Sequence, residues 1–447
     1  MTIVDVAPRV ARGEVKSETL TEQCLSQIEA LNPKLNAFIT ITAEAALKAA
    51  RAADKDIAGG RYRGPLHGIP VSLKDLIDVE GVRTSAGSQV RVDHVATRDA
   101  VVTARLREAG AIFVGKTNLH EFAFGTTTED SGFGLARNPV DASRSPGGSS
   151  GGSAIAVATG MSLGTVGTDT GGSIRIPAAA CGIVGLKPGW GEISAAGVVP
   201  LSRQLDHVGP LASCVADAWL QYNAILPAAQ RAAAMPKSAP LTGMRFGVPT
   251  GYLFDRLDAD VERVVSGTIE TLRAAGATVT DVTIPHATDM AAIYLHLVLG
   301  DAAEYHARTL LARPQDYTPN VRLRLEMARY VLAEDYIRAL RGKAVIAHEV
   351  DAALEGLDAL VLPALAIPAP PIGAATMPVK GGPEAVRTLM LRCSQPFNLS
   401  GHPAISLPCG TTHGGLPIGL QLAGHKGRTP ALVQTALAVE HAIAKAG

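Results

Sequence analysis

The fold is decided by one stretch of the chain, Gly167-Thr168-Asp169-Thr170-Gly171-Gly172-Ser173-Ile174-Arg175. The apolar run before it, residues 163–168, predicts a strand, and residues 176–181 after it are compatible with a helix. Two adjacent glycines at a turn between a strand and a helix allow the backbone to approach a ligand closely. We therefore expect the N–H groups from Thr170 to Ser173 to stabilise a developing oxyanion, with the Ser173 hydroxyl beside them.

Short apolar runs alternate with helical stretches on both sides of this turn. The predicted strands are residues 68–77, 111–115, 163–168, 244–248, 278–282, 359–363, 404–407 and 418–422. The predicted helices are residues 17–33, 42–57, 100–108, 153–159, 259–274 and 430–444, and a mainly helical block at residues 286–354 is typical of a cap. This alternation predicts an α/β protein built as one large unit around a largely parallel or mixed sheet.

The composition excludes several classes of partner. The 447 residues carry 41 Lys and Arg against 41 Asp and Glu, so the formal net charge is zero. A neutral chain offers no basic surface to nucleic acid or to an acidic membrane, and its charge agrees with a small, uncharged substrate. Because the sequence has neither a leader-like N-terminus nor an apolar run of about 18 residues, we expect a cytoplasmic protein with no membrane partner.

The cysteines do not indicate a disulfide framework or a zinc cluster. They are odd in number, widely scattered and never in C-x-x-C spacing. We expect each to be a buried free thiol. The five are Cys24, Cys181, Cys214, Cys393 and Cys409.

A phosphate-loop pattern, G-x-x-x-x-G-K-[ST], occurs at residues 110–117. A phosphate loop needs free N–H groups in a cradle between a strand and a helix. Here the four residues after Gly110 are themselves the predicted strand, and the sheet requires their N–H groups. We therefore reject nucleotide binding at this pattern.

The pattern G-x-S-x-G of a nucleophile elbow occurs twice in residues 146–152, centred on Ser149 and on Ser150. An elbow follows a strand, whereas turn-forming residues precede this one. The pattern therefore does not favour a Ser-His-Asp esterase, which stays only an alternative function with His207 or His402 as its base.

A lysine on a predicted strand is a candidate base. Within residues 68–77, Ser72 and Lys74 share one face of the strand. The Ser173 hydroxyl would need such a base to become a nucleophile. The competing interpretation of Lys74 is an ordinary solvated lysine. For the Gly- and Ser-rich residues 145–173, the competing interpretation is a flexible linker.

Eight motifs follow one another along nearly the whole chain. They are Gly68-Ile-Pro-Val-Ser-Leu-Lys74-Asp75, Gly115-Lys-Thr-Asn118-Leu-His-Glu121-Phe122, Gly147-Gly-Ser149-Ser150-Gly-Gly-Ser-Ala154, Gly167-Thr-Asp-Thr-Gly-Gly-Ser173-Ile-Arg175-Ile-Pro177, Gly182-Ile-Val-Gly-Leu-Lys187-Pro188, Leu205-Asp206-His207-Val-Gly209-Pro210, Asn398-Leu-Ser-Gly401 and Gly415-Leu-Pro417-Ile-Gly419-Leu-Gln421. In this order they closely resemble the amidase signature family. The resemblance implies one α/β domain over residues 1–447, with a mixed central sheet covered by helices on both faces. Its expected parts are N-terminal helices in residues 1–60, a catalytic core in residues 65–215 and a helical block in residues 286–354 that shapes the substrate pocket.

The resemblance also implies a Ser-cisSer-Lys mechanism that needs no cofactor and no metal. Matching residue for residue makes Ser173 the nucleophile, Ser149 the bridging serine after a cis peptide bond with Gly148, and Lys74 the base. The implied oxyanion hole consists of the N–H groups of Thr170, Gly171, Gly172 and Ser173. Ser150, Asp169 and Arg175 then orient the loops, or serve only as structural hydrogen-bond partners.

The expected reaction is hydrolysis of a small amide, anilide or carbamate-like substrate. Relatives that take ammonia from glutamine are expected to carry an acidic residue seven positions before Asn398, where this chain has Leu391. Glutamine amidotransfer therefore stays an alternative, as does a non-enzymatic scaffold. Arg203 either meets an anionic group of the substrate or lies on the surface. The expected partner is a small-molecule substrate, and a homodimer stays open.

Overall fold

An 11-stranded sheet runs through the molecule in a computed structural model that describes residues 1–446. The strand order is β1-β3-β2-β4-β6-β5-β12-β13-β9-β7-β8. The strands are β1 (Phe38–Ile41), β2 (Pro70–Lys74), β3 (Ile112–Thr117), β4 (Gly164–Asp169), β5 (Val184–Lys187), β6 (His207–Ala212), β7 (Arg245–Pro249), β8 (Thr278–Val282), β9 (Ala359–Pro363), β12 (Ala404–Thr411) and β13 (Pro417–Ala423). Two further short strands, β10 (Thr376–Met377) and β11 (Glu384–Ala385), form a separate ribbon.

The sheet is mixed. β2 pairs in parallel with β3 and β4, and β7 pairs in parallel with β8 and β9. The strands between these two groups, β6, β5, β12 and β13, pair antiparallel with their neighbours. The expected α/β architecture with a mixed central sheet is thus confirmed.

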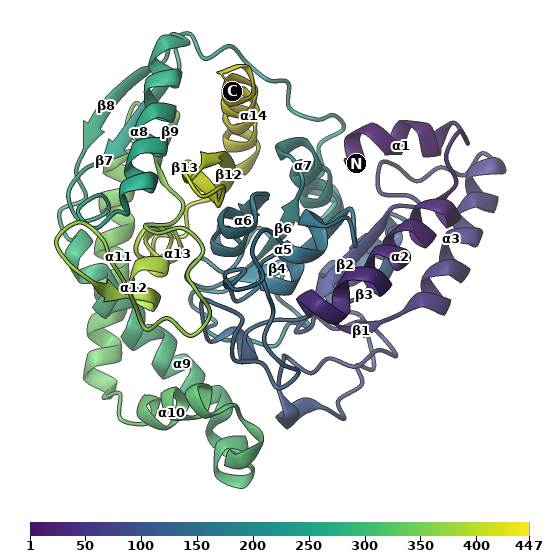
Figure 1. The fold of residues 1–447 in the computed structure, drawn as a ribbon, viewed down its shortest axis with the longest axis horizontal. Coiled ribbons are helices and arrows are strands. Elements are labelled where there is room, and N and C mark those ends of the chain that lie inside the picture. The colour runs from purple at the N-terminus through teal and green to yellow at the C-terminus, as the bar shows by residue number, and fades with distance from the viewer. Residues whose placement is uncertain (447) are drawn as a thin grey trace.

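Helices cover the sheet on both faces, as Figure 1 illustrates. They are α1 (Ile3–Ala11), α2 (Ser17–Leu35), α3 (Ala43–Ala58), α4 (Val101–Glu108), α5 (Gly151–Ala158), α6 (Arg175–Cys181), α7 (Val215–Ile225), α8 (Ala259–Ala274), α9 (Met290–Ala312), α10 (Pro319–Ala328), α11 (Ala333–Ala353), α12 (Val386–Arg392), α13 (Pro396–Leu399) and α14 (Thr429–Ala446). α5 and α6 pack on each other against one face of the sheet, and α14 packs with α7 and α8 on the other face. β9 is buried along its whole length between helical layers and is apolar throughout, with the sequence Ala-Leu-Val-Leu-Pro.

The block at residues 286–354 is helical and consists mainly of α9, α10 and α11. α9 packs against both α10 and α11, and α9 and α11 also contact α13. In Figure 1 this group extends away from the sheet at the lower left.

The structure corrects several predicted boundaries. The strand predicted at residues 68–77 ends at Lys74, because the N–H groups of Leu76 and Ile77 turn back to the Lys74 carbonyl. α2 continues past the predicted stop at Asn32-Pro33 and ends at Leu35, where Asn36 takes a left-handed conformation. The sequence does not predict the strands β1, β5, β6, β10 and β11 or the helices α1, α7, α12 and α13.

Two rejected interpretations are settled by this architecture. The phosphate-loop pattern lies on β3, so its backbone is part of the sheet. The supposed linker contains the buried helix α5 and strand β4.

All five cysteines are free, and only Cys214 is not fully buried.

The helices within residues 1–446 include none that is both long enough and apolar enough to cross a lipid bilayer.

Candidate active site

Lys74 lies at the carboxyl end of β2 and is completely buried. Its Nζ lies 2.8 Å from Ser149 Oγ and 2.8 Å from Thr168 Oγ1. β4 is the parallel neighbour of β2, so the ends of the two strands meet at one edge of the sheet and bring Thr168 to the lysine. The solvated-lysine interpretation is therefore wrong.

Burial lowers the pKa of Lys74 to about 7, and the carboxylates of Asp169 and Asp206 only partly oppose this shift. The two atoms that contact Nζ are hydroxyl oxygens, which stabilise an ammonium group less than a carboxylate would. A lysine in this state can accept a proton near neutral pH.

Ser149 follows Gly148 through a cis peptide bond, as the family resemblance implies. The loop is held by the N–H of His120, which donates to the Ser149 carbonyl at 3.1 Å. A Cβ at Gly148 would lie 2.8 Å from the backbone nitrogens of Thr127 and Thr128. Glycine at position 148 therefore lets two backbone segments approach each other.

Ser173 lies beside this loop, and its carbonyl accepts the N–H of Ser150 at 3.3 Å. The Ser150 hydroxyl donates to the Thr168 carbonyl at 3.2 Å, which ties the loop to β4. Within residues 1–446, the Ser173 hydroxyl has no hydrogen-bond partner, and the residue is 6% exposed. Ser149, Ser150 and Ser173 are thus brought together at the end of β4.

The turn from Thr170 to Ser173 is held by the carboxylate of Asp169. This carboxylate accepts the N–H of Gly172 at 2.7 Å and the N–H of Ile174 at 3.1 Å. The prediction that the N–H of Gly172 belongs to the oxyanion hole is wrong, because this N–H already donates to the Asp169 carboxylate. The N–H groups of Thr170, Gly171 and Ser173 have no acceptor among the described residues.

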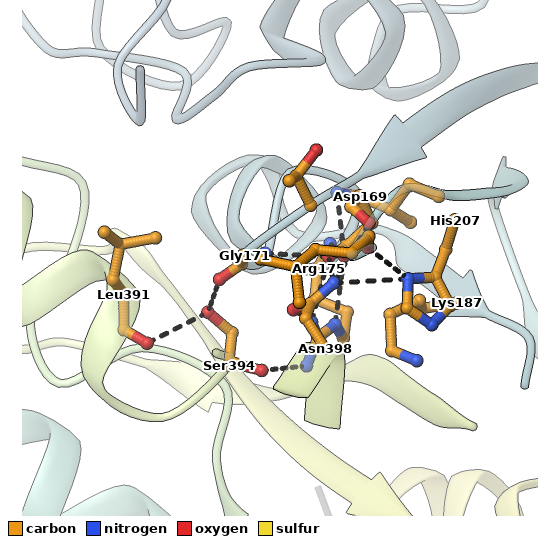
Figure 2. Close-up of polar contacts among 12 residues, drawn as sticks. Asp169, Gly171, Arg175, Lys187, His207, Leu391, Ser394 and Asn398 are labelled. Atoms are coloured by element: carbon orange, nitrogen blue, oxygen red, sulfur yellow. Dashed lines mark hydrogen bonds and ion pairs between the residues drawn. The ribbon is translucent and has the colours of Figure 1, made fainter. Parts of the chain in front are cut away.

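Arg175 connects this turn to the segment that carries Ser394 and Asn398 (Figure 2). Its guanidinium contacts Asp169 Oδ1 at 3.0 Å and the side-chain oxygen of Asn398 at 2.6 Å. It also donates to the Ser394 carbonyl at 2.8 Å and to Gln421 at 2.7 Å. Burial raises the pKa of Asp169, but the Arg175 charge outweighs it and holds this pKa well below its ordinary value.

Asn398 and Ser394 complete the same network. The Asn398 amide donates to the Asp169 carbonyl at 3.0 Å, and the Ser394 hydroxyl donates to the Gly171 carbonyl at 2.6 Å. Asp169, Arg175, Asn398 and Ser394 therefore form one hydrogen-bond network that holds the turn. Sequence reasoning placed Asn398 within a motif but gave it no role, and it missed Ser394.

Asp206 holds Thr170, the first residue of the turn, in place. Its carboxylate accepts the Thr170 hydroxyl at 2.7 Å and the Leu201 N–H at 2.9 Å. Burial raises the pKa of Asp206 to about 6. Asp206 also lines a cavity of about 350 Å³ together with Trp190 and the exposed Arg203.

The helical block reaches the site through Tyr294 on α9. A Cβ placed on Gly171 would lie 2.6 Å from the Tyr294 hydroxyl. The tyrosine is buried, and burial raises its pKa to about 12. α9 therefore covers the turn.

No histidine side chain of residues 1–446 forms a hydrogen bond with the hydroxyl of Ser149, Ser150 or Ser173. The Nδ1 of His207 lies 2.7 Å from the Leu205 carbonyl, and the Nε2 of His402 lies 3.0 Å from Asp351. The described residues also include no group of three or more His, Cys, Asp or Glu side chains that could hold a metal ion.

The chain is similar to known amidases over almost its whole length. The family model described as Amidase matches residues 19–433. A glutamyl-tRNA(Gln) amidotransferase subunit of Chloroflexus aggregans is 38% identical over 95% of this chain and 92% of that protein. A crystal structure of an amidase superposes with a TM-score of 0.93 at 36% identity, covering 99% of both chains. A peptide amidase from Stenotrophomonas maltophilia superposes with a TM-score of 0.85 at 33% identity, covering 99% of this chain and 96% of that one.

Proposed function

Because this chain belongs to the amidase signature family, we propose that it hydrolyses the C–N bond of a small amide, anilide or carbamate-like substrate through an acyl-enzyme on Ser173. The observation that carries the proposal is the contact of 2.8 Å between Lys74 Nζ and Ser149 Oγ, with the lysine completely buried. A neutral amine next to a hydroxyl can receive the proton that a second serine loses on attack.

In the first half-reaction, Ser173 Oγ attacks the substrate carbonyl carbon. Its proton passes to Ser149 Oγ, and the Ser149 proton passes to Lys74 Nζ. The carbonyl oxygen becomes an oxyanion that accepts the N–H groups of Thr170, Gly171 and Ser173. The C–N bond then breaks, and the departing nitrogen takes the proton back along the same relay.

In the second half-reaction, water attacks the ester carbonyl of the acyl-enzyme. Lys74 again receives the proton through Ser149, and the same N–H groups stabilise the second oxyanion. The ester bond breaks, Ser173 Oγ regains a proton, and the carboxylic acid leaves. Asp169, held by Arg175, keeps the turn in place through both steps.

The test is a panel of aryl amides, aliphatic amides and carbamates, assayed with EDTA present. We expect turnover of at least one class, and loss of kcat by about 10³-fold or more in Ser173→Ala and Lys74→Ala variants. A His207→Ala or His402→Ala variant that still folds should retain activity. Unchanged turnover in the Ser173→Ala variant would refute the proposed nucleophile, and loss in a folded histidine variant would favour the Ser-His-Asp esterase.

A second candidate function is amide hydrolysis within a glutamine amidotransferase, which the 38% identity to such an enzyme's subunit favours. Leu391 counts against it, because relatives that take ammonia from glutamine are expected to carry an acidic residue at this position. Ammonia release from glutamine should therefore be slow in the wild type and faster in a Leu391→Asp variant. Glutamine turnover that exceeds turnover of every simple amide in the wild type would instead support this second function.

A further inference from the structure

The peptide group between Gly171 and Gly172 is held at both of its polar ends. Its carbonyl oxygen accepts the Ser394 hydroxyl at 2.6 Å, and its N–H donates to the Asp169 carboxylate at 2.7 Å. The carbonyl and the N–H of a trans peptide group point in opposite directions, so the two contacts together fix its rotation. Figure 2 shows the Ser394 hydroxyl directed at this carbonyl.

This peptide group lies between two donors of the proposed oxyanion hole. The N–H of Gly171 precedes it and the N–H of Ser173 follows it, and neither has an acceptor among residues 1–446. The angle between these two N–H groups depends on the backbone rotations of Gly171 and Gly172. Glycine permits more backbone conformations than any other residue, so the two glycines alone would leave this angle loosely defined. The contacts with Asp169 and Ser394 remove that freedom.

Ser394 is the only donor to the Gly171 carbonyl within the part of the chain that the structure describes. The serine is completely buried, and Gly171 is buried as well. The Ser394 hydroxyl also lies 3.3 Å from the Leu391 carbonyl, but a hydroxyl has one proton and the contact with Gly171 is the shorter. Loss of this hydroxyl would therefore leave a buried carbonyl without its donor.

The backbone of Ser394 is held independently of its hydroxyl. It lies between α12 and α13, where its N–H donates to the Leu391 carbonyl at 3.1 Å and its carbonyl accepts the Arg175 guanidinium at 2.8 Å. Replacement of the side chain keeps both of these contacts. A Ser394→Ala variant should therefore lose the contact with Gly171 while the segment around position 394 stays in place.

The Ser394 side chain also packs directly against the turn. A Cβ at Gly172 would lie 2.8 Å from the Cβ of Ser394, closer than side chains can pack. Gly172 has a φ of +138°, which also favours glycine. The hydroxyl at position 394 therefore reaches the turn because residue 172 has no side chain.

We propose that Ser394 is a positioning residue for the oxyanion hole, because its hydroxyl fixes the peptide group between the donors Gly171 and Ser173. This inference rests on the proposed amidase function. Donors that are already aimed at the developing charge need no reorganisation during the reaction, so they act on the transition state more than on substrate binding. Removal of the Ser394 hydroxyl should therefore lower kcat and leave KM nearly unchanged.

The kinetic test compares Ser394→Ala, Ser394→Thr and Ser400→Ala on the aryl amide that the wild type hydrolyses fastest. In Ser394→Ala we expect kcat to fall by about tenfold or more and KM to change by less than about twofold, and Ser394→Thr, which keeps a hydroxyl, should recover part of the loss. Ser400 is the matched control, because it is a buried serine whose hydroxyl has no partner within residues 1–446. An unchanged kcat in Ser394→Ala, or an equal loss in Ser400→Ala, would overturn the inference.

A trifluoromethyl ketone that corresponds to the same amide gives a second readout. Ser173 Oγ bonds to the ketone carbon, its proton passes through Ser149 to Lys74, and the ketone oxygen becomes an oxyanion. The inhibition constant should therefore rise in Ser394→Ala by the same factor as kcat/KM falls. A variant that merely contains less folded enzyme would lose kcat with an unchanged inhibition constant, and this result would refute the positioning role.

Hydrogen exchange separates this inference from the proposed function, because it needs no turnover. In Ser394→Ala we expect faster amide exchange in a peptide containing residues 169–175, and in Ser400→Ala no change there. Faster exchange in Ser394→Ala, together with a wild type that hydrolyses no amide, would refute the amidase proposal and keep the role of Ser394 in fixing the turn. Unchanged exchange in Ser394→Ala would refute the role of Ser394 whatever the hydrolytic activity.

Discussion

The lowered pKa of Lys74 predicts a specific pH dependence of both catalysis and stability. The pKa of Lys74 is lowered to about 7, so at a higher pH the buried amine is neutral and able to accept a proton. We expect log kcat/KM for a neutral aryl amide to rise with a slope of one below about pH 7 and to level off above it. The ordinary lysine value of 10.5 would put this inflection several pH units higher.

Stability should change over the window between these two pKa values. The pKa is depressed in the folded state, so the unfolded chain binds more protons, and the free energy of unfolding rises with pH across this window. One unit of pKa difference corresponds to about 1.4 kcal/mol, so Lys74 should contribute a rise of about 2 kcal/mol between about pH 7 and pH 9. Below the folded pKa the contribution of Lys74 to stability is constant and unfavourable.

The variant that removes the titrating amine is Lys74→Met. Lys48→Met, at an exposed position on α3, is its control. Denaturant unfolding at several pH values should show the rise in the wild type and in the control, and its absence in Lys74→Met. The Lys74→Met variant should also lose turnover at every pH. An inflection in kcat/KM that stays near 10, or the same rise in stability in Lys74→Met, would refute the assignment of Lys74 as the neutral base.

Three further changes test the turn that is proposed to hold the oxyanion. Gly171→Ala places a methyl group against the Tyr294 hydroxyl and should lower kcat for an aryl amide by about 100-fold, with partial rescue by Tyr294→Phe; no rescue would contradict this steric cause. Asn398→Ala removes two bonds to Asp169 and should lower the free energy of unfolding by about 2 kcal/mol in denaturant titrations; a change below about 0.5 kcal/mol would show that the network is dispensable. Asp206→Asn keeps an acceptor for the Thr170 hydroxyl and should lower kcat by less than about tenfold, whereas Asp206→Ala should lower it more; equal effects would point to the charge of Asp206 rather than its hydrogen bond.

Sequence reasoning predicted the parts of the fold with strong local signals. The amphipathic α8 was placed without error, because Asp258 caps a run with clear helical periodicity. β5 and β6 were missed, because Val-Gly-Leu-Lys and His-Val-Gly-Pro-Leu-Ala contain residues that weaken strand propensity. They form strands because antiparallel pairing with β4 and β12 buries them.

The candidate site was predictable where its residues are adjacent in the chain, and not where the fold assembles it. Asp169 and Arg175 stand six residues apart in one motif, whereas their partners Ser394 and Asn398 come from a segment beyond the helical block. Local pattern cannot specify a hydrogen bond across such a separation. The occupied N–H of Gly172 was missed for a related reason, because it depends on the orientation of the Asp169 side chain.

Three buried lysines illustrate what the surroundings add to a motif. Lys116 contacts the Asp75 carboxylate at 3.0 Å, so its charge is neutralised by an ion pair. Lys187 donates to the carbonyl of His402 at 2.6 Å and to that of Pro188 at 3.2 Å, two groups that accept hydrogen bonds and offer no proton to relay.

Lys74 differs from both in having only hydroxyl partners, and one of them belongs to Ser149. A hydroxyl can donate a proton as well as accept one, so the Ser149 hydroxyl can pass Lys74 a proton from a neighbouring serine. Lys116 also contacts a hydroxyl, that of Thr84 at 3.0 Å, but its amine is paired with the Asp75 carboxylate. All three lysines lie in sequence motifs and all three are almost completely buried. What distinguishes the candidate base is therefore the chemistry of the atoms that contact its amine, rather than its burial alone.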